Sequence, residues 1–399
     1  MKILFVNIGN AGSTGKIIQG ISAAAESKGF EVLCAYPDNK VNPPMREHDY
    51  IIESVTQKLI TRELTYITGL EGGLSFVPTI RLIKKIKEFK PDIIHLHNLH
   101  GWYLNLNMLF KFISENDIKI IWTFHDCWPF TGHCTHFQKT NCKKWITGCH
   151  SCEQHLDTPK SYLDNSKRMY KLKKKLFLSP KNLTIVTPSN WLANLVRQSF
   201  FKDVDIRVIH NGIDRSIFKP TESNFRQRYS LENKKIILGV SSVWGEKKGL
   251  DIFIRLANDL DDNYKIVLVG TDDRVDSILP KNIISIHRTN NQIELAEIYS
   301  AADVFVNPTR EDTFPTVNIE ALSCGCPVIT FDVCGCTEIP DNTSGIVVPK
   351  DDYKSILMNI ELVCQQGFID KKSCVERAKL VDQKQKTEDY INLYYSSCV

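Results

Sequence analysis

Apolar residues recur along the chain in short runs that are separated by longer amphipathic segments. In the first half, runs of strand length occupy residues 3–7, 31–36, 92–96, 119–124 and 183–188. Short runs of this kind, bounded by turn residues, are typical of strands buried in a sheet. Because helix-length segments separate them, the sequence predicts a parallel sheet in an α/β fold. The first strand, a glycine loop and a helix over 16–28 form the opening of a Rossmann-like unit.

The same alternation begins again near residue 235. Five further strands are predicted at 236–240, 265–270, 283–287, 304–307 and 328–331, with helices at 251–259, 292–300 and 317–324. A turn at Asn211-Gly212 and a polar stretch up to residue 233 separate the halves. At 399 residues the chain has the length of two domains. We expect Rossmann-like domains over 1–212 and 213–378, and a C-terminal helix over 379–399 that packs back on the first domain.

Ligands of open α/β sheets bind outside the carboxyl ends of the strands. In the expected arrangement the two domains face an interdomain cleft that is lined by those strand ends. Phosphate groups belong at the helix N-termini there.

Composition and charge narrow the class of protein. With 42% hydrophobic and 24% charged residues the chain is globular, and no apolar run approaches the roughly 20 residues of a membrane span. The N-terminal residues do not have the pattern of a signal peptide, so we expect a cytoplasmic protein. Residues 1–212 hold 28 Lys and Arg against 18 Asp and Glu, whereas the remainder holds 22 against 28. The basic half suits an anionic surface or acceptor, and the acidic half argues against nucleic acid along the whole molecule.

The glycine loop after the first strand holds Gly9, Gly12 and Gly15. A P-loop would need glycine where Asn10 stands and Ser or Thr where Ile17 stands, so a nucleoside triphosphate site is not favoured. Two interpretations stay open. The loop forms a backbone nest close to a diphosphate or sugar, with Gly12 at the ligand, or it is only a tight turn.

Three polar side chains have positions that suit a ligand site. His125 directly follows the strand at 119–124, where cleft residues lie, although a lone histidine also serves structural roles. Asp312 follows a later strand, and Glu320 lies about two helical turns further on. Backbone amides around 315–318 can hold a diphosphate while the two carboxylates hold hydroxyl groups. The alternative is a capping acid and a solvated helix glutamate.

Asp312, Glu320 and the following Ala-Leu-Ser-Cys-Gly-Cys-Pro-Val resemble the C-terminal signature of glycosyltransferase family 4, whose members are retaining enzymes of the GT-B fold. The similarity extends over the whole chain, through Val-Thr-Pro-Ser at 186–189, Val-Ile-His-Asn-Gly-Ile-Asp at 208–214 with Phe218, and Ser-Ala-Ala-Asp-Val-Phe-Val at 300–306. Leu-His-Asn-Leu-His-Gly at 96–101 and His-Asp-Cys-Trp-Pro-Phe-Thr-Gly at 125–132 are similar to the exopolysaccharide branch that includes colanic acid enzymes.

The resemblance implies a role for each matching position. Glu320 would bind the ribose of a nucleotide sugar, and His125 would contact the sugar near the reacting carbon. Lys248 would hold the diphosphate, with Lys247 as a substitute for the family's arginine, whose position here is Ser242 or its neighbour. The remaining implied contacts are Asp312 and the loop Phe314, Pro315, Thr316 and Val317 on the donor, and His97 and His100 on the acceptor side.

The resemblance implies transfer of a hexose from a nucleotide-diphosphate sugar to a lipid-linked saccharide acceptor in surface polysaccharide synthesis. Fixed amides and Lys248 would stabilise the departing charge, and the leaving phosphate would deprotonate the acceptor. No Asp-x-Asp motif suited to a nucleotide sugar is found, so catalysis is expected to need no divalent metal. The alternatives are a sugar-nucleotide epimerase of the same fold and a non-catalytic, zinc-bearing scaffold of a polysaccharide assembly complex.

A cysteine-rich insertion over about 127–152 carries a separate prediction. Cys134, Cys142, Cys149 and Cys152 end in a Cys-x2-Cys pair, a spacing compatible with a structural zinc site. Free thiols are the alternative. Four protein ligands would leave no open position for catalysis.

Residues 166–177 interleave apolar and cationic side chains. Such a run is usually a solvated helix face, but in an enzyme with a lipid-linked acceptor it would also suit anionic headgroups. Peripheral contact with the cytoplasmic face of the inner membrane, through the basic N-terminal domain, is therefore part of the expectation.

Overall fold

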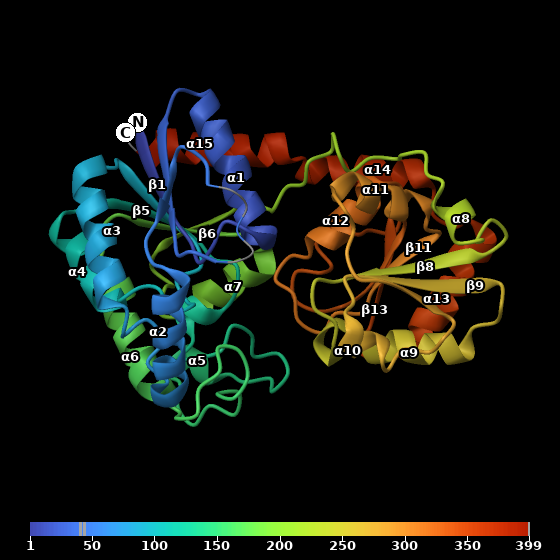
Figure 1. Cartoon of the computed structure of the whole chain (residues 1–399), viewed down its shortest axis with the longest axis horizontal. Coiled ribbons are helices and arrows are strands. Elements are labelled where there is room, and N and C mark those ends of the chain that lie inside the picture. Colours follow the sequence, from blue (N-terminus) through green and yellow to red (C-terminus); the bar gives the residue numbers. More distant parts are fainter. Residues whose placement is uncertain (40–41, 43–44, 398–399) are drawn as a thin grey trace. The chain divides into compact units, whose positions relative to one another are not determined.

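The computed structural model describes residues 1–39, 42 and 45–397, and the chain divides into two compact units. The N-terminal domain comprises Met1–His210 together with Lys386–Val399, and the C-terminal domain comprises Asn211–Gln385 (Figure 1). Each domain contains one parallel sheet with helices between its strands. The predicted fold class, α/β with two Rossmann-like domains, is confirmed.

The sheet of the N-terminal domain has the strand order β3-β2-β1-β4-β5-β6-β7. Its strands are β1 (Lys2–Val6), β2 (Glu31–Tyr36), β3 (Asp49–Ile51), β4 (Ile93–Leu96), β5 (Lys119–Thr123), β6 (Leu183–Thr187) and β7 (Asp205–Val208). The helices are α1 (Gly12–Ser27), α2 (Val55–Thr68), α3 (Phe76–Phe89), α4 (Leu106–Glu115), η1 (Trp128–Phe130), α5 (Lys144–Thr147), α6 (Ser166–Phe177), α7 (Asn190–Gln198) and α15 (Gln383–Ser397).

Strand β1 shows why the apolar runs are continuous rather than alternating. Leu4 and Val6 belong to one buried cluster, whereas Ile3 and Phe5 belong to another. Successive side chains of a strand point to opposite faces of the sheet, so both faces of this sheet are covered.

The sheet of the C-terminal domain has the order β10-β9-β8-β11-β12-β13. Its strands are β8 (Lys235–Val240), β9 (Tyr264–Val269), β10 (Ile283–Ile286), β11 (Val304–Asn307), β12 (Val328–Phe331) and β13 (Gly345–Val348). The helices are α8 (Phe225–Arg228), η2 (Glu246–Lys248), α9 (Leu250–Asp259), α10 (Asp273–Asp276), α11 (Gln292–Ala301), α12 (Thr316–Ser323), α13 (Tyr353–Gln366), α14 (Lys371–Ala378) and η3 (Lys379–Val381). Across the residues that the structure describes, no helix combines the length and apolar character needed to traverse a membrane.

The domain limits differ from the expected ones at the C-terminal crossing. Residues 379–385 belong to the C-terminal domain, whereas the sequence predicts that they begin the C-terminal helix that packs on the N-terminal domain. The amide of Ile213 donates to the carbonyl of Val381 at 3.1 Å, and the amide of Gln383 donates to the carbonyl of Ile213 at 2.9 Å. These backbone bonds tie the segment to the start of the C-terminal domain, so the unit changes at Lys386.

The end of the chain packs in the N-terminal domain (Figure 1, red helix α15). Tyr390, Ile391 and Tyr394 are buried in the same cluster as Ile3 and Phe5. One core of the N-terminal domain is therefore completed by residues almost 400 positions from its first strand.

Both sheets have a point where the strand order reverses direction, between β1 and β4 and between β8 and β11. Parallel strands on either side of such a point send their connections to opposite faces, which opens a crevice at their carboxyl ends. Ligand-binding residues are therefore expected in the segments that follow these four strands.

Candidate functional site

Two lysine–carboxylate pairs join the segments that follow β8 and β11. Lys248 Nζ lies 2.6 Å from Asp312 Oδ2, and Lys247 Nζ lies 3.1 Å from Glu311 Oε2. The lysines stand in η2, at the entry to α9, and the acids stand in the loop between β11 and α12. The predicted residues Lys247, Lys248 and Asp312 are thus brought together across the reversal point of the sheet.

A close approach of backbone to backbone holds the two segments in this position. Gly249 has a positive φ of 71°, and a Cβ added there would meet Pro308 at 2.5 Å. The amide of Arg310 donates to the carbonyl of Lys247 at 2.8 Å. Only glycine permits both the left-handed conformation and the contact, which explains the Lys-Gly pair.

Arg310 was not among the predicted site residues, although it stands next to Glu311. Its guanidinium donates to Asp251 of α9 at 2.8 Å and to Asp351 at 2.6 Å, and a further bond reaches the carbonyl of Glu246. This clamp links the β11 loop to η2 and α9. Only the tertiary partners distinguish it from a surface arginine, since Asp251 and Asp351 are distant in sequence.

The charges of the pair determine what it can bind. Burial alone lowers the pKa of Lys248, but the Asp312 carboxylate outweighs burial, and the pKa lies above its ordinary value. Lys248 is therefore a cation at neutral pH. A partly buried ammonium group beside a helix start is suited to an anionic ligand.

The N-terminus of α12 follows directly. Pro315 is the residue before the helix and provides no side-chain cap, so the first amides of Thr316 and Val317 have no partner within the helix. Asn318 is buried and accepts a bond from Asn307 Nδ2 at 2.7 Å, which anchors the helix to the end of β11. Phe314 is buried at 4% exposure. The predicted loop from Phe314 to Val317 therefore presents backbone amides rather than its largest side chain.

Glu320 lies on α12, where Tyr299 Oη of α11 donates to its Oε2 at 3.2 Å. Burial and the Glu320 charge raise the pKa of Tyr299, so this tyrosine stays a hydrogen-bond donor. Ser242, in the loop after β8, is exposed. The helix thus carries an oriented carboxylate one to two turns from its amide end, whereas Ser242 supplies only a short hydroxyl in place of a long cation.

In the N-terminal domain, histidines gather at the ends of β4 and β5. His97 Nδ1 lies 2.9 Å from His125 Nε2, and the two rings stack with centroids 5.3 Å apart. His95, inside β4, lies 4.2 Å from the His97 ring and contacts Tyr394 Oη at 2.7 Å and Thr123 Oγ1 at 2.8 Å. The predicted pair His97 and His125 is therefore one contact unit, with His95 beneath it as a residue the sequence did not single out.

These histidines are neutral at physiological pH. Burial lowers the pKa of His125 to about 4 and that of His95 to about 3, and burial also holds the pKa of His97 far below its ordinary value. His97 Nε2 is buried without a hydrogen-bond partner among the described residues. His125 is the partly exposed member of this pair, and a neutral imidazole can exchange hydrogen bonds with sugar hydroxyls without introducing charge.

His100, predicted on the acceptor side, pairs with a carboxylate. Its Nε2 lies 2.9 Å from Asp126 Oδ2, and Asp126 also accepts from the amide of Trp128 at 2.8 Å. Burial opposes protonation, but Asp126 outweighs burial and raises the pKa of His100. Nearby, Glu71 accepts bonds from the amides of Gly101 and Trp102. These contacts give His100 a part in orienting the loop after β4.

Gly12 is the first residue of α1 and has a φ of 70°. Ala11 before it provides no side-chain cap for the first amides of α1. Asn10, which replaces the P-loop glycine, is buried and bonds to Asp49 at 3.3 Å. Gly15 fits closely, since its added Cβ would meet Asn10 at 2.5 Å. Both a backbone nest and a tight turn agree with this geometry.

The four cysteines of the insertion line one cavity. Its wall also includes His133, His150, Phe137, Trp145 and Lys144. Cys134 and Cys152 hydrogen-bond through their side chains, which lowers the pKa of Cys152 to about 7, and the amide of Gly132 donates to Cys149 Sγ at 3.1 Å. Within the described residues, three or more potential ligand atoms lie within 4.8 Å of one another only at a different place. The cysteines therefore converge without forming a closed set.

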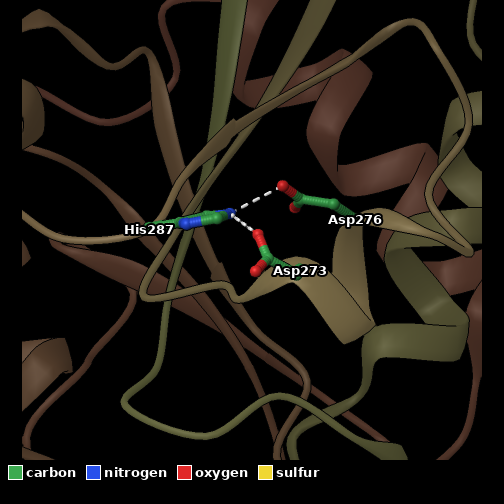
Figure 2. Close-up of side chains that lie close together, drawn as sticks. All are labelled: Asp273, Asp276 and His287. Atoms are coloured by element: carbon green, nitrogen blue, oxygen red, sulfur yellow. Dashed lines mark hydrogen bonds and ion pairs between the residues drawn. The ribbon is translucent and has the colours of Figure 1, made fainter.

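That other place is an exposed trio at the ends of β9 and β10. His287 Nε2 lies 2.6 Å from Asp276 and 3.9 Å from Asp273 (Figure 2). The hydrogen bond that His287 donates to Asp276 raises the pKa of His287, which makes this an ion pair on the surface. We assign no metal site to these three exposed residues.

Comparisons with known proteins agree with the two-domain pattern. A protein named as the colanic acid biosynthesis glycosyl transferase WcaC of Escherichia coli is 25% identical over 315 residues, which is 76% of each chain. N,N'-diacetylbacillosaminyl-diphospho-undecaprenol alpha-1,3-N-acetylgalactosaminyltransferase of Campylobacter jejuni is 26% identical over 241 residues, 57% of this chain and 62% of the other. The solved structure of HepE from Anabaena in complex with UDP has a TM-score of 0.69 and 14% identity, covering 99% and 100% of the two chains, and shows a shared fold.

Residues 234–366 match the family described as Glycosyl transferases group 1, and residues 15–217 match Glycosyltransferase Family 4. The second match covers half of the chain, and it includes the histidine cluster at the ends of β4 and β5. The match over residues 234–366 includes the two lysine–carboxylate pairs and helix α12. The chain therefore belongs to glycosyltransferase family 4, with the GT-B fold that the sequence motifs indicated.

Proposed function

We propose that the protein transfers a hexose, with retention of configuration, from a nucleotide-diphosphate sugar to a lipid-linked saccharide during surface polysaccharide synthesis. One observation carries the proposal. Lys248 Nζ lies 2.6 Å from the Asp312 carboxylate, and Asp312 stands four residues before Thr316, where helix α12 begins without a side-chain cap. A cation, a carboxylate and free amides are the groups that a sugar diphosphate requires. Glu320, on the same helix, supplies a carboxylate for the ribose hydroxyls.

The chemistry follows from where charge develops. The bond between the anomeric carbon and the diphosphate oxygen breaks, and a bond from that carbon to the acceptor oxygen forms. The acceptor proton passes to the leaving phosphate on the same face. Lys248 and the amides of Thr316 and Val317 stabilise the growing negative charge, and no step in this scheme requires a metal ion. On the N-terminal domain, the neutral and partly exposed His125, which contacts the buried His97, is suited to hydrogen bonds with sugar hydroxyls.

The acceptor class comes from the relatives. The name of the Campylobacter jejuni relative specifies a diphospho-undecaprenol acceptor, and that of the Escherichia coli relative specifies colanic acid biosynthesis. UDP is the nucleotide in the HepE complex. These names support a lipid-linked saccharide as acceptor and a nucleoside diphosphate as leaving group.

A donor screen tests the proposal. The purified chain is incubated with common nucleotide sugars and membrane lipid extract, and products are identified by mass spectrometry and anomeric configuration by NMR. Glu320→Ala should lower donor turnover by on the order of a hundredfold, because a hydrogen-bonded charge is lost from the donor site. The matched control is Glu361→Ala, an exposed glutamate of α13, which should leave turnover unchanged. Full activity of Glu320→Ala would contradict the assignment.

Nucleotide sugars also distinguish the proposed transferase from the two alternative functions, an epimerase and a non-catalytic scaffold. An epimerase of this fold would convert a nucleotide sugar into a new nucleotide sugar with no acceptor present. A scaffold would bind neither nucleoside diphosphate nor nucleotide sugar in calorimetry. The partly buried, positively charged Lys248 and the helix α12, which has no side-chain cap, favour the transferase over the scaffold, since a scaffold has no use for an anion site.

We also propose a structural zinc ion between Cys134, Cys142, Cys149 and Cys152. The four thiols line one cavity, and Gly132 donates an amide hydrogen bond to the Cys149 sulfur, as second-shell groups do at metal thiolates. Burial lowers the pKa of the fully buried Lys173 to about 7, and the charges of Cys149 and Cys134 act in the opposite direction, so thiolates at this site would favour the ammonium form of Lys173. Because the sulfurs do not yet form a closed set, zinc would have to draw them together.

Metal analysis of the purified chain tests the zinc site. We expect one equivalent of zinc, and Cys149→Ser should lower the zinc content and the melting temperature of the N-terminal domain. Cys364→Ser, a buried thiol of α13 outside the insertion, should leave the zinc content unchanged. Well under one equivalent in the wild type, prepared without chelator, would count against the site.

A further inference from the structure

Two helices of the N-terminal domain expose an unusual number of large apolar side chains. Their exposed fractions range from 43% to 59%, and the residues are Leu59, Ile60, Leu64 and Ile67 on α2 and Phe76, Val77 and Ile80 on α3. Single exposed apolar residues are ordinary on a protein surface, but a concentration on neighbouring helices marks an interaction site.

An ordinary surface helix buries its apolar side chains and exposes its polar ones, whereas helix α2 exposes its apolar side chains. Thr65 is its only buried residue, while Ile60, Leu64 and Ile67 recur at the spacing of one helix face and point into solvent. The inward side is held by other means. Tyr66 packs edge-on against Trp102, and Asn165 donates to the carbonyl of Thr68. The apolar face of α2 therefore has no partner within the described chain.

Helix α3 continues the surface. Its later residues Leu82 and Ile86 are buried in the core, whereas Phe76, Val77 and Ile80 in its first turns are exposed. Arg81 of α3 donates to Gln57 of α2 at 3.4 Å, so the two helices lie next to each other. We call the seven exposed apolar residues with their two helices the α2–α3 face.

Cations border this face. Between residues 55 and 89 the sequence has six Lys and Arg against three Glu, and one of the acids, Glu71, is buried at 4% exposure. Arg81, Lys84 and Lys87 are exposed along α3. Apolar side chains flanked by lysine and arginine match the chemistry of a bilayer interface, with acyl chains beneath anionic headgroups.

Helix α6, the basic run that the sequence indicated, lacks this combination. Its Met169, Tyr170, Leu176 and Phe177 are buried in the domain, and Lys173 is buried as well. The exposed side of α6 is cationic without apolar residues. The exposed side of α6 can attract anionic headgroups, but it has no exposed large apolar side chain that could insert among acyl chains.

We infer that the α2–α3 face is the surface on which the N-terminal domain docks to an anionic phospholipid bilayer. The choice of a bilayer over a protein partner rests on the charge of this face and on the proposed function, in which the acceptor is anchored in lipid. Docking by a few side chains and several cations gives reversible attachment rather than insertion of a helix through the membrane.

Vesicle sedimentation tests the inference. The full chain is mixed with vesicles of phosphatidylcholine alone or of phosphatidylcholine with phosphatidylglycerol. We expect binding to the anionic vesicles that weakens with salt. The triple variant Ile60→Ser, Leu64→Ser, Ile67→Ser should bind on the order of a hundredfold more weakly, because three apolar contacts with the bilayer are lost. A control triple in the C-terminal domain, Ile278→Ser, Ile293→Ser, Met358→Ser, removes side chains of similar exposure and should bind like the wild type.

The outcomes separate this inference from the proposed function. Hydrolysis of a nucleotide sugar without lipid reports donor turnover, and both triples should keep it. If the α2 triple binds vesicles as well as the wild type does, or if the wild type binds none, the docking surface is wrong even though donor turnover persists. A wild-type dimer that the α2 triple converts to a monomer, in light scattering, would assign the face to contact between copies and would also overturn the inference.

Discussion

At the residue scale, environment decides the chemistry of groups that look alike in the sequence. His97, His100 and His125 are all close to strand ends, yet His100 pairs with Asp126 while His97 and His125 bond to each other. The result is one histidine favoured as a cation and two held neutral. Lys247 and Lys248 differ in a similar way, because Lys247 is half-exposed and pairs with the buried Glu311, whereas Lys248 pairs with Asp312.

The buried histidines predict an acid-sensitive N-terminal domain. In the unfolded chain a histidine takes up a proton near pH 6.5, whereas burial delays this until about pH 4 for His125 and about pH 3 for His95. The unfolded state then binds more protons, so the free energy of unfolding falls as pH drops from about 6.5 towards 4. The slope is about 1.4 kcal/mol per pH unit for each histidine that stays neutral.

Urea denaturation at a series of pH values, followed by tryptophan fluorescence, measures this slope. His95→Gln should reduce the slope by the contribution of one buried histidine, about 1.4 kcal/mol per pH unit. A free energy of unfolding that does not change between pH 6.5 and 4.5 would contradict the prediction.

At the scale of elements, short connections place the site and one distant helix completes a core. The glycine turn after η2 and the Arg310 clamp fix the loop after β11 against the start of α9. Helix α15, the last element, supplies Tyr390 and Tyr394 to the histidine cluster under β4 and β5. The site loops are thus fixed by neighbours in space, and the histidine cluster depends on the end of the chain.

The contact between α15 and β4 leads to a stability prediction. Tyr394→Phe removes the 2.7 Å bond to His95 and leaves a buried nitrogen without its partner, which should cost about 1–3 kcal/mol of unfolding free energy. Tyr395→Phe, at a side chain that is 48% exposed, should cost much less. Both are measured by urea denaturation. Equal stability of the two variants would mean that the α15 hydroxyl contributes nothing to the core.

The elements also show how far the sequence pattern could be followed. Strands with two buried faces, such as β1, β5 and β11, were predicted to within a residue or two, since both faces demand apolar side chains. The sheet-edge strands β3, β7 and β13 were missed. Strand β7 alternates exposed and half-buried residues, with Asp205 and Arg207 outward, and β3 has only three residues. These three strands are short or expose part of their residues, which weakens the apolar pattern, whereas the edge strand β10, with three isoleucines, was predicted.

At the scale of the molecule, the two domains divide the proposed chemistry. The C-terminal domain carries Lys248, Asp312 and Glu320, for which we propose donor binding, and the N-terminal domain carries His97 and His125 and the α2–α3 face. The charge asymmetry read from the sequence follows this division. A basic domain suits an anionic lipid surface, and a mildly acidic one limits non-specific attraction to it.

The sequence by itself determined the two Rossmann-like domains, the approximate strand positions and the motifs that place the chain in its family. These depend on local apolar periodicity and on residue types at short spacing, which a linear pattern preserves. Only the tertiary structure decided which lysine pairs with which acid, that Arg310 clamps the site, that His95 and α15 support the histidine pair, and that α2 turns its apolar face outward. Such facts depend on contacts between residues distant in the chain and on which side of a helix is covered, and neither is encoded in the local pattern.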